Sequence, residues 1–265
     1  MRAAAVQMTS TDDVDRNLET ADRLTRAAAA NGARLVVLPE KWPALGTNDV
    51  VRQGAQDLNG PAITWARRTA KELDIDLVAG SIALRDGARL RNTAVHIGPD
   101  GEIHATYTKM HLFDVEVDGR AYKESEHEDA GDETVVTTLA DGTSAGLSIC
   151  YDLRFPLLFE ELGQRGAEVV VVPSAFTLKT TQDHWEILVR ARAIEQQAFV
   201  VAANQVGEHP GGMSSGGRSM IVDPWGAILA EVAEGEGVAA ADLDAERQRR
   251  IRAELPALKH RRVRV

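Results

Sequence analysis

The sequence predicts an α/β protein in which two β-sheets pack together and helices cover their outer faces. Short apolar runs, such as 34–38 and 168–172, have the length of buried strands, and segments with apolar residues at helical spacing lie between several such runs. Other strands are joined by turn sequences and form hairpins. A chain with both kinds of connection favours packed sheets with helices outside. No repeat, low-complexity linker or change of composition divides residues 1–265, so we expect one domain.

In the N-terminal half, helical periodicity and turn residues mark the elements. Apolar residues recur every three or four positions after Asp12-Asp13, which are typical of a helix start, and Asn31-Gly32 is typical of a helix end. The expected order is a strand at 2–8, a helix between those two signals, a strand at 34–38, a helix at 61–73, a strand at 76–82, and a hairpin of strands 91–97 and 103–107.

In the C-terminal half, two segments lack periodicity. Residues 118–133 are polar and acidic, which predicts a long ordered loop, and 207–217 form a glycine-rich connector that matches neither phosphate-loop pattern. The expected elements around them are strands 135–139 and 144–149, a helix that starts at Phe155-Pro156-Leu157 and ends near Gly163, strand 168–172, helix 182–197, strand 198–204, a hairpin of 218–222 and 227–232, and strand 238–243.

Composition and charge narrow the classes of function. The chain has 30 Lys and Arg against 40 Asp and Glu, a formal net charge of −10, which argues against general nucleic-acid binding. One cysteine cannot form a disulfide within the chain, and the N-terminal residues lack the apolar core of a signal peptide. The longest apolar runs are too short to cross a membrane. We therefore expect a cytoplasmic protein.

The end of the chain has the opposite charge. From Arg247 to Val265, eight Lys or Arg accompany one acidic residue, Glu254. Such a tail could contact nucleic acid. No aromatic residues interleave its charges, so we favour the alternative, in which the tail lies on the acidic body of its own or a partner subunit.

Residues 146–156, Gly-Leu-Ser-Ile-Cys-Tyr-Asp-Leu-Arg-Phe-Pro, place the only cysteine where an apolar strand stops and a helix is about to start. A sharp elbow at Cys150 would expose the thiol at the rim of a sheet and leave the following N–H groups free to bind an anion, as acyl transfer requires. Taken alone, Cys150 also fits an inert buried cysteine, which is the commoner case.

Two further reactive side chains follow predicted strands. Glu40 comes just after strand 34–38, and Lys109 lies just past the second strand of the hairpin. Because helix-linked strands present their ends as the rim of a site, we expect Glu40, Lys109 and Cys150 to gather there. The alternative for Glu40 and Lys109 is a surface ion pair worth under about 1 kcal/mol.

Four stretches resemble, in order, the nitrilase superfamily of carbon–nitrogen hydrolases. They are Leu-Pro-Glu40, Tyr-Thr-Lys109-Met-His-Leu-Phe-Asp114, Cys150-Tyr-Asp-Leu-Arg-Phe-Pro156 and Gly217-Arg-Ser-Met-Ile-Val-Asp-Pro-Trp-Gly226. The resemblance spans nearly the whole chain and implies the four-layer α-β-β-α sandwich of the nitrilase type. It also implies a Glu-Lys-Cys triad of Glu40, Lys109 and Cys150, and a homodimer or larger homo-oligomer. It favours a nucleophilic Cys150 over an inert one.

The resemblance assigns a second catalytic glutamate to Glu124. Glu124-Ser125 followed by Ala130-Gly131-Asp132 is similar to the Nit branch of the superfamily, which usually has proline where Ala130 stands. Glu126 and Glu128 compete for this assignment. The alternative is that the acidic segment is a solvated face.

The chemistry accounts for these residue types. A thiol is mostly protonated at pH 7, so Cys150 needs a base, and Glu40 can serve. Lys109 would favour the thiolate and stabilise an oxyanion, together with a backbone N–H near Tyr151. Glu40 would then protonate departing ammonia and activate the water that hydrolyses the thioester. Glu124 could position the substrate or Lys109.

Other catalytic groups are weaker candidates. None of the seven histidines lies in a recognisable cysteine-protease pattern, and no spacing typical of a zinc site is present, so we expect neither a cofactor nor a metal. His111 and the helix start at His184-Trp185-Glu186 are expected to support the structure near the site.

The closest branch of the resemblance is the Nit-type amidases, through 109–117 and 184–195. It implies hydrolysis of the terminal amide of a small ω-amide, such as 2-oxoglutaramate or deaminated glutathione. Arg154 suits a substrate carboxylate, although it could instead pair with Asp152. Three residues that follow another strand end are expected on the pocket wall: Ser174, Ala175 and Phe176.

Two other functions stay open. One is hydrolysis of N-carbamoyl amino acids or other aliphatic amides, with nitriles ranked lower. The other is a binding or assembly module on the same fold, which the occupied positions Glu40, Lys109 and Cys150 argue against.

Overall fold

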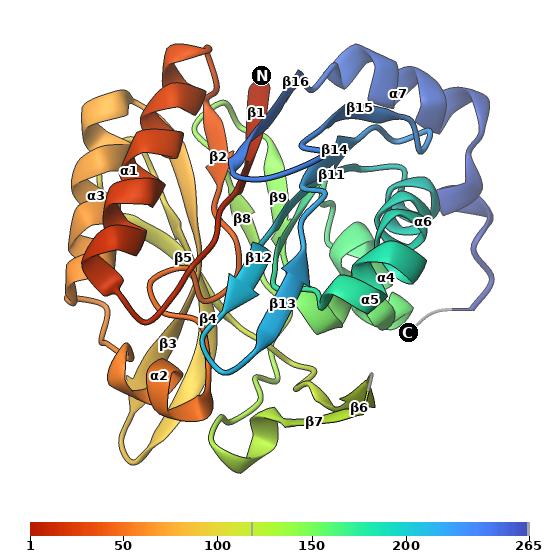
Figure 1. Cartoon of the computed structure of the whole chain (residues 1–265). Helices are drawn as coiled ribbons and strands as arrows, with labels where there is room; N and C mark the ends of the chain where they lie inside the picture. The colour runs from red at the N-terminus through yellow and green to blue at the C-terminus, as the bar shows by residue number, and fades with distance from the viewer. Residues whose placement is uncertain (118, 264–265) are drawn as a thin grey trace.

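Two six-stranded sheets pack face to face between two layers of helices (Figure 1), in a computed structural model that describes residues 1–117 and 119–263. Helices α1 (Val14–Ala30) and α3 (Pro61–Leu73) cover one sheet, and α4 (Pro156–Gln164) and α6 (Glu186–Gln196) cover the other. The expected four-layer α-β-β-α sandwich is confirmed.

The first sheet combines parallel and antiparallel strands in the order β16-β1-β2-β3-β4-β5. Strands β1, β2 and β3 are parallel, and the outer pairs are antiparallel. The strands are β1 (Arg2–Gln7), β2 (Leu35–Val37), β3 (Asp76–Asp86), β4 (Arg89–Ile97), β5 (Ile103–Thr108) and β16 (Gly237–Asp242). As predicted, α1 is capped by Asp13, whose carboxylate accepts from the Arg16 N–H at 3.0 Å, and α3 has Pro61 in its first turn.

The second sheet has the order β15-β14-β11-β10-β9-β8. Its central strands β9, β10 and β11 are parallel. The strands are β8 (Val136–Thr138), β9 (Ser144–Leu147), β10 (Val169–Ser174), β11 (Phe199–Asn204), β14 (Met220–Val222) and β15 (Ile228–Glu231).

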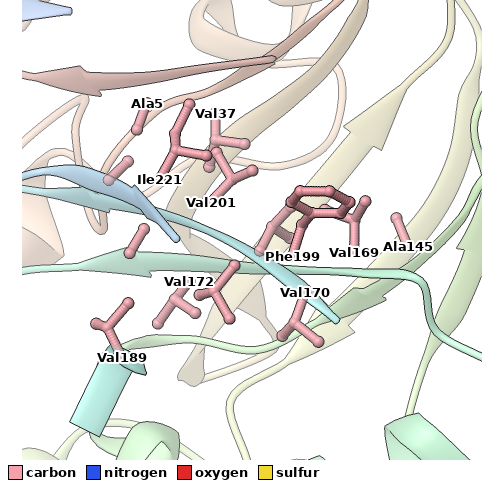
Figure 2. Packing of buried hydrophobic residues seen from close by; sticks show 14 of the residues in the cluster. Ala5, Val37, Ala145, Val169, Val170, Val172, Val189, Phe199, Val201 and Ile221 are labelled. Carbon is pink, nitrogen blue, oxygen red and sulfur yellow. The ribbon is translucent and has the colours of Figure 1, made fainter. Parts of the chain in front are cut away.

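Apolar side chains fill the space between the sheets and under the helices. Figure 2 shows Ala5 and Val37 of the first sheet near Val201 of the second, all fully buried. Val172 points to the opposite side of its sheet, where Val189 of α6 lies. This two-sided burial explains why the central strands are continuous apolar runs in the sequence.

Two segments that were expected to lack regular structure contain hairpins. Within and beside the acidic segment, β6 (Asp114–Val117) pairs with β7 (Arg120–Lys123), and a short 3-10 helix follows at Glu124–Glu126; residue 118 lies outside the described residues. In the glycine-rich segment, β12 (Val206–His209) pairs with β13 (Met213–Gly216). Both hairpins are separate from the large sheets. The first has a local signal that the expectation of a loop did not use: polar residues alternate with valine in Asp114–Val117, and Asp118-Gly119 is a common hairpin-turn sequence.

Shorter helical elements lie between the strands, among them a 3-10 helix at Cys150–Arg154 that precedes α4. A short helix, α2 (Asn48–Gln53), follows β2. The helix expected at 182–197 begins earlier, as α5 (Leu178–Thr180) and a π-helical turn at Thr181–Trp185 that continues into α6. Within the described part of the chain, no helix combines the length and the apolar character that a membrane span requires.

The basic end of the chain lies on its own subunit. It forms α7 (Ala245–Glu254) and a 3-10 helix at Ala257–His260. Arg247 pairs with the buried Asp223 at 2.7 Å, and Arg252 donates to the Gln197 carbonyl at 3.0 Å. These contacts confirm the prediction that the tail lies on the protein body. Arg264, the last of the eight basic residues, lies outside the described residues.

A bulge in β3 shapes the end of β2, where Glu40 stands. The pairing of β3 with β4 shifts register between Val78 and Ser81, and Gly80 there has a φ of +50°. A Cβ on Gly80 would overlap the Pro39 carbonyl oxygen, which accepts from the Ser81 N–H at 3.3 Å. The bulge therefore holds the residue before Glu40 against β3.

The close approach at Gly80 predicts an unequal response to alanine at two glycines. Gly87 has a φ of +60° but open space around it, so Gly87→Ala should cost only the backbone strain, about 1 kcal/mol. Gly80→Ala adds the overlap with Pro39 and should cost more than about 3 kcal/mol. Urea unfolding of both variants measures the difference, and equal losses would contradict the role of the bulge.

Candidate active site

The ends of strands from both sheets surround one cavity of about 300 Å³. Glu40 follows β2, Lys109 follows β5 and Cys150 follows β9, and all three line this cavity together with Glu124. The structure thus brings together the four residues that the sequence analysis predicted to be catalytic. They come from segments up to 110 positions apart in the chain, from residue 40 to residue 150.

Glu40 is held by donors on both carboxylate oxygens. Its Oε1 accepts from Lys109 Nζ at 2.9 Å and from Asn92 Nδ2 at 2.8 Å. Its Oε2 accepts from the Ala175 N–H at 2.9 Å. With only 4% of its surface exposed, Glu40 belongs to a buried network, and the alternative of a surface ion pair with Lys109 is wrong.

Lys109 is an ammonium ion between two carboxylates. Its Nζ donates to Glu40 at 2.9 Å and to Glu124 Oε2 at 2.8 Å, and its surface is 1% exposed. Burial alone would lower the pKa of Lys109, but the charges of Glu124 and Glu40 outweigh burial and raise it well above its usual value. Lys109 therefore stays charged at neutral pH.

Glu124 is the glutamate of the acidic segment that reaches Lys109. Its Oε2 also accepts from the Phe113 N–H at 2.8 Å, and its Oε1 accepts from Lys41 Nζ at 2.9 Å and Asn92 Nδ2 at 3.2 Å. Burial would raise the pKa of Glu124, but Lys109 and Lys41 lower it well below its usual value. Glu124 is thus an ionised, fully bonded carboxylate, and the alternative of a solvated face is wrong for it.

Neither of the two competing glutamates hydrogen-bonds to Lys109, whose described partners are Glu40 and Glu124. Glu126 is exposed and pairs with Lys123 at 3.3 Å. Glu128 is buried, lines the cavity and pairs with Lys41 at 2.5 Å. Burial raises the pKa of Glu128 to about 7, an effect that the Lys41 charge opposes and the Glu124 charge reinforces.

Cys150 lies at the expected elbow, with a φ of 48° and 7% of its surface exposed. The thiol is less exposed than an elbow at a sheet rim predicts, because it lines the buried part of the cavity. Burial and the Glu40 carboxylate raise the pKa of Cys150 well above its usual value, although Lys109 acts in the expected direction and lowers it. The resting side chain is therefore a thiol.

Asp152 fixes the elbow. Its Oδ2 accepts from the Ile149 N–H at 2.9 Å and from the Tyr107 hydroxyl at 2.7 Å. Its Oδ1 accepts from the His111 N–H at 3.1 Å and lies 2.8 Å from His111 Nδ1. As expected, His111 supports the structure beside the site.

Arg154 lines the cavity, and among the described residues no carboxylate pairs with it. Its guanidinium lies 5.4 Å from the centre of the Phe176 ring and 5.9 Å from that of Tyr151. The nearest polar partner is His184 Nδ1, at 3.3 Å. The alternative pairing with Asp152 is therefore not found among the described residues.

The other expected wall residues divide into two groups. Tyr151, Ala175 and Phe176 line the cavity. Ser174 does not, because it is fully buried and its hydroxyl donates to the Val172 carbonyl at 3.3 Å. Its carbonyl instead accepts from the Glu40 N–H at 3.3 Å.

Sequence reasoning missed Asn92 and Lys41. Each had a signal in the sequence: Asn92 is a polar residue that directly precedes the buried part of β4, residues 93–97, and Lys41 directly follows Glu40. Among the described residues, no group of three or more His, Cys, Asp or Glu side chains is placed to hold a metal ion.

The charges around Cys150 predict the pH range in which its thiol loses its proton. Because burial and Glu40 raise the pKa of the thiol, its thiolate absorbance should be absent at neutral pH and appear only on the alkaline side of an ordinary cysteine. Glu40→Gln removes a repelling charge and should shift the transition to lower pH, and Lys109→Met should shift it to higher pH. Subtracting the spectrum of Cys150→Ala isolates the signal. A wild-type thiolate plateau at neutral pH would contradict this balance of charges.

Comparison with known proteins places the chain among enzymes that act on carbon–nitrogen bonds. The sequence profile described as carbon-nitrogen hydrolase matches residues 2–253. A deaminated glutathione amidase of Synechocystis sp. is 39% identical over 264 residues, covering 98% of this chain and 97% of that protein. An omega-amidase of Pongo abelii is 34% identical over 262 residues, covering 98% and 94%. The crystal structure of Saccharomyces cerevisiae Nit3, a member of branch 10 of the nitrilase superfamily, matches with a TM-score of 0.87 at 29% identity, covering 99% of this chain and 97% of Nit3.

Proposed function

Because the chain belongs to the carbon–nitrogen hydrolase family, we propose that it is a thiol amidohydrolase of the Nit type. Its substrate is a small ω-amide that bears a carboxylate, such as 2-oxoglutaramate or deaminated glutathione, and its products are the acid and ammonia. The observation that carries the proposal is the buried cavity in which Cys150 lies with Glu40 and Lys109.

The first half of the reaction forms a thioester. Glu40 takes the proton of the Cys150 thiol as the sulfur attacks the amide carbon, which matches a resting thiol beside a carboxylate. Lys109 has three N–H donors, of which two go to Glu40 and Glu124, so the third can stabilise the oxyanion with a backbone N–H near Tyr151. When the C–N bond breaks, Glu40 gives its proton to the departing ammonia.

The second half regenerates the thiol. Glu40 removes a proton from water as the water oxygen attacks the thioester, and the C–S bond breaks to release the acid. The sulfur then recovers the proton from Glu40, so the net reaction is amide plus water to acid plus ammonia. Glu124 already accepts four hydrogen bonds, so its lone pairs are occupied and it does not act as a base. Its role in the proposal is to hold Lys109 in place.

The cavity wall supplies substrate recognition. Arg154 offers a planar cation to the substrate carboxylate, and its guanidinium lies against the Tyr151 and Phe176 rings. The Ala175 N–H orients Glu40. Ser174 acts through its carbonyl, which accepts from the Glu40 N–H.

A second substrate class fits the same groups. An N-carbamoyl amino acid also presents a terminal amide and a carboxylate, so Arg154 can pair with it too, although its carboxylate lies closer to the bond to be cleaved. A binding or assembly module is disfavoured, because such a protein has no use for a buried lysine between two carboxylates beside a thiol.

We further propose that the whole chain is one domain and that the enzyme acts in the cytoplasm without a cofactor or a metal. We propose that it forms a homodimer or a larger homo-oligomer. Exposed apolar side chains on the outer helical layer support self-association. Leu157 of α4, Ile187 and Ile194 of α6, and Trp225 of the β14–β15 turn are each about half exposed or more.

Replacing the nucleophile tests the reaction class. Cys150→Ala should lower ammonia release by at least about 10⁴-fold on every substrate, because no other cysteine is present to replace it. A panel of ω-amides, N-carbamoyl amino acids and nitriles, read by coupled ammonia detection, identifies the substrate. Rapid quenching of the wild type should trap an acyl group on Cys150. Ammonia release by Cys150→Ala would exclude the assignment, and a folded wild type that is silent across the panel would favour a binding module.

Replacing Arg154 tests the carboxylate site. Arg154→Leu should lower kcat/KM about 10- to 100-fold on amides that carry a carboxylate, since a charge-assisted hydrogen bond is lost. Neutral amides of the same length should react nearly unchanged. Arg165→Leu, at the C-terminal end of α4 and outside the lining of the cavity, is the matched control. An equal loss on both kinds of amide would show that Arg154 supports the structure instead.

A further inference from the structure

Lys41 is a second buried ammonium beside the proposed triad. Its Nζ donates to Glu124 Oε1 at 2.9 Å and to Glu128 Oε1 at 2.5 Å, and its side chain is 11% exposed. Burial would lower the pKa of Lys41, but Glu124 and Glu128 raise it above its usual value. Lys41 is therefore a buried cation whose partners are both carboxyl groups at the cavity.

The backbone bends to place Lys41 there. Lys41 has a φ of 48°, in the left-handed region that costs free energy for a residue with a Cβ. Its N–H donates to Ser81 Oγ at 3.0 Å, at the same β3 bulge that holds Pro39. A strained residue that faces the reacting groups indicates a functional constraint.

Glu128 is anchored so that it can meet Lys41. The backbone around it is bonded to the neighbouring strand β4, where the Asp129 N–H donates to the Leu90 carbonyl at 2.8 Å. Arg89 donates to the Glu128 carbonyl at 2.9 Å. Glu128 Oε1 accepts from Lys41, and its buried Oε2 has no hydrogen-bond partner among the described residues. Its side chain thus has one polar contact in the described structure, and that contact is Lys41.

These contacts form a charge cluster of alternating sign, in the order Glu40, Lys109, Glu124, Lys41, Glu128. We propose that Lys41 and Glu128 are positioning residues for the amidase reaction: Lys41 holds Glu124 from the side opposite Lys109, and Glu128 holds Lys41. The inference rests on the proposed function of the triad and adds two residues that act behind it.

The physical reason is the position of Glu124 between two ammonium groups. With Lys41 on Oε1, the Glu124 carboxylate is turned so that Oε2 receives Lys109. Without Lys41, Oε1 keeps only Asn92, and Glu124 can rotate and draw Lys109 away from Glu40. A small displacement of Lys109 would then weaken its contact with the oxyanion.

Substituting Lys41 tests the inference with two measurements. Lys41→Met should lower kcat about 10- to 100-fold and change KM by no more than about threefold, because Arg154 and the rings beside it, which are proposed to bind the substrate carboxylate, are unchanged. The alkylation of Cys150 by iodoacetamide, followed by mass spectrometry, should slow by a similar factor. This second readout needs no substrate, and Cys150 is the only cysteine that can react.

Two substitutions test Glu128. Glu128→Gln keeps an acceptor oxygen for Lys41 and should retain activity within about threefold, whereas Glu128→Leu removes the acceptor and should lower kcat about tenfold. Because Glu128 acts through Lys41, Glu128→Leu should have no further effect in the Lys41→Met protein.

Asp76→Asn is the control for a purely structural effect. Asp76 is a buried carboxylate paired with His96 at 3.0 Å, at the start of β3 and away from the cavity. It should lower thermal stability and leave kcat and alkylation unchanged.

The inference is wrong if folded Lys41→Met keeps both rates within about threefold, or if Glu128→Leu lowers them equally with and without Lys41. A wild type that releases no ammonia from any amide would instead overturn the proposed function, and the alkylation rates would still decide the role of Lys41.

Discussion

The arrangement of the site depends on burying the Lys109 ammonium. Removing a charged group from water costs several kcal/mol even in real proteins, and only close opposite charges with further hydrogen bonds offset that cost. Glu40 and Glu124 both bond to Lys109, and each carboxylate is held in turn by Asn92 and by a backbone N–H. Because the two carboxylates stand on different segments, the network forms only when the ends of β2 and β5 and the acidic segment meet.

The same network sets the protonation state of Cys150, the proposed nucleophile. A thiol close to an ammonium alone would ionise readily, but Cys150 also faces the Glu40 carboxylate in a buried place, and the balance keeps its proton. The protonated thiol and the ionised base are then adjacent, so proton transfer can accompany attack on the carbonyl. Lys109 keeps its charge, and in the proposed reaction it favours the negative oxygen that forms in the transition state.

Elements with strong local signals were predictable from the sequence, and long-range contacts were not. Helix α3 has the predicted bounds, Pro61–Leu73, because proline at its start and an apolar face are both local. The hairpin of Asp114–Val117 and Arg120–Lys123 was missed although its first strand alternates acidic residues with valine, because the acidic composition of the segment favours a loop. The motifs located Glu40, Lys109, Glu124 and Cys150, but the contacts of Asn92 and Lys41 appear only when the acidic segment folds over β4.

The charge cluster also limits how a substrate can enter. Three carboxyl groups accompany two ammonium groups at the catalytic end, so that end offers no net positive charge to an acidic substrate. Arg154 and Arg120 line other parts of the same cavity and supply positive charge there. An amide that bears a carboxylate is therefore favoured only when the two groups are separated along the molecule, with the amide at Cys150 and the carboxylate at the arginine side. For the proposed reaction, this distribution of charge favours ω-amides over amides whose carboxylate lies beside the bond to be cleaved, and it follows from the same buried ion pairs that hold Lys109.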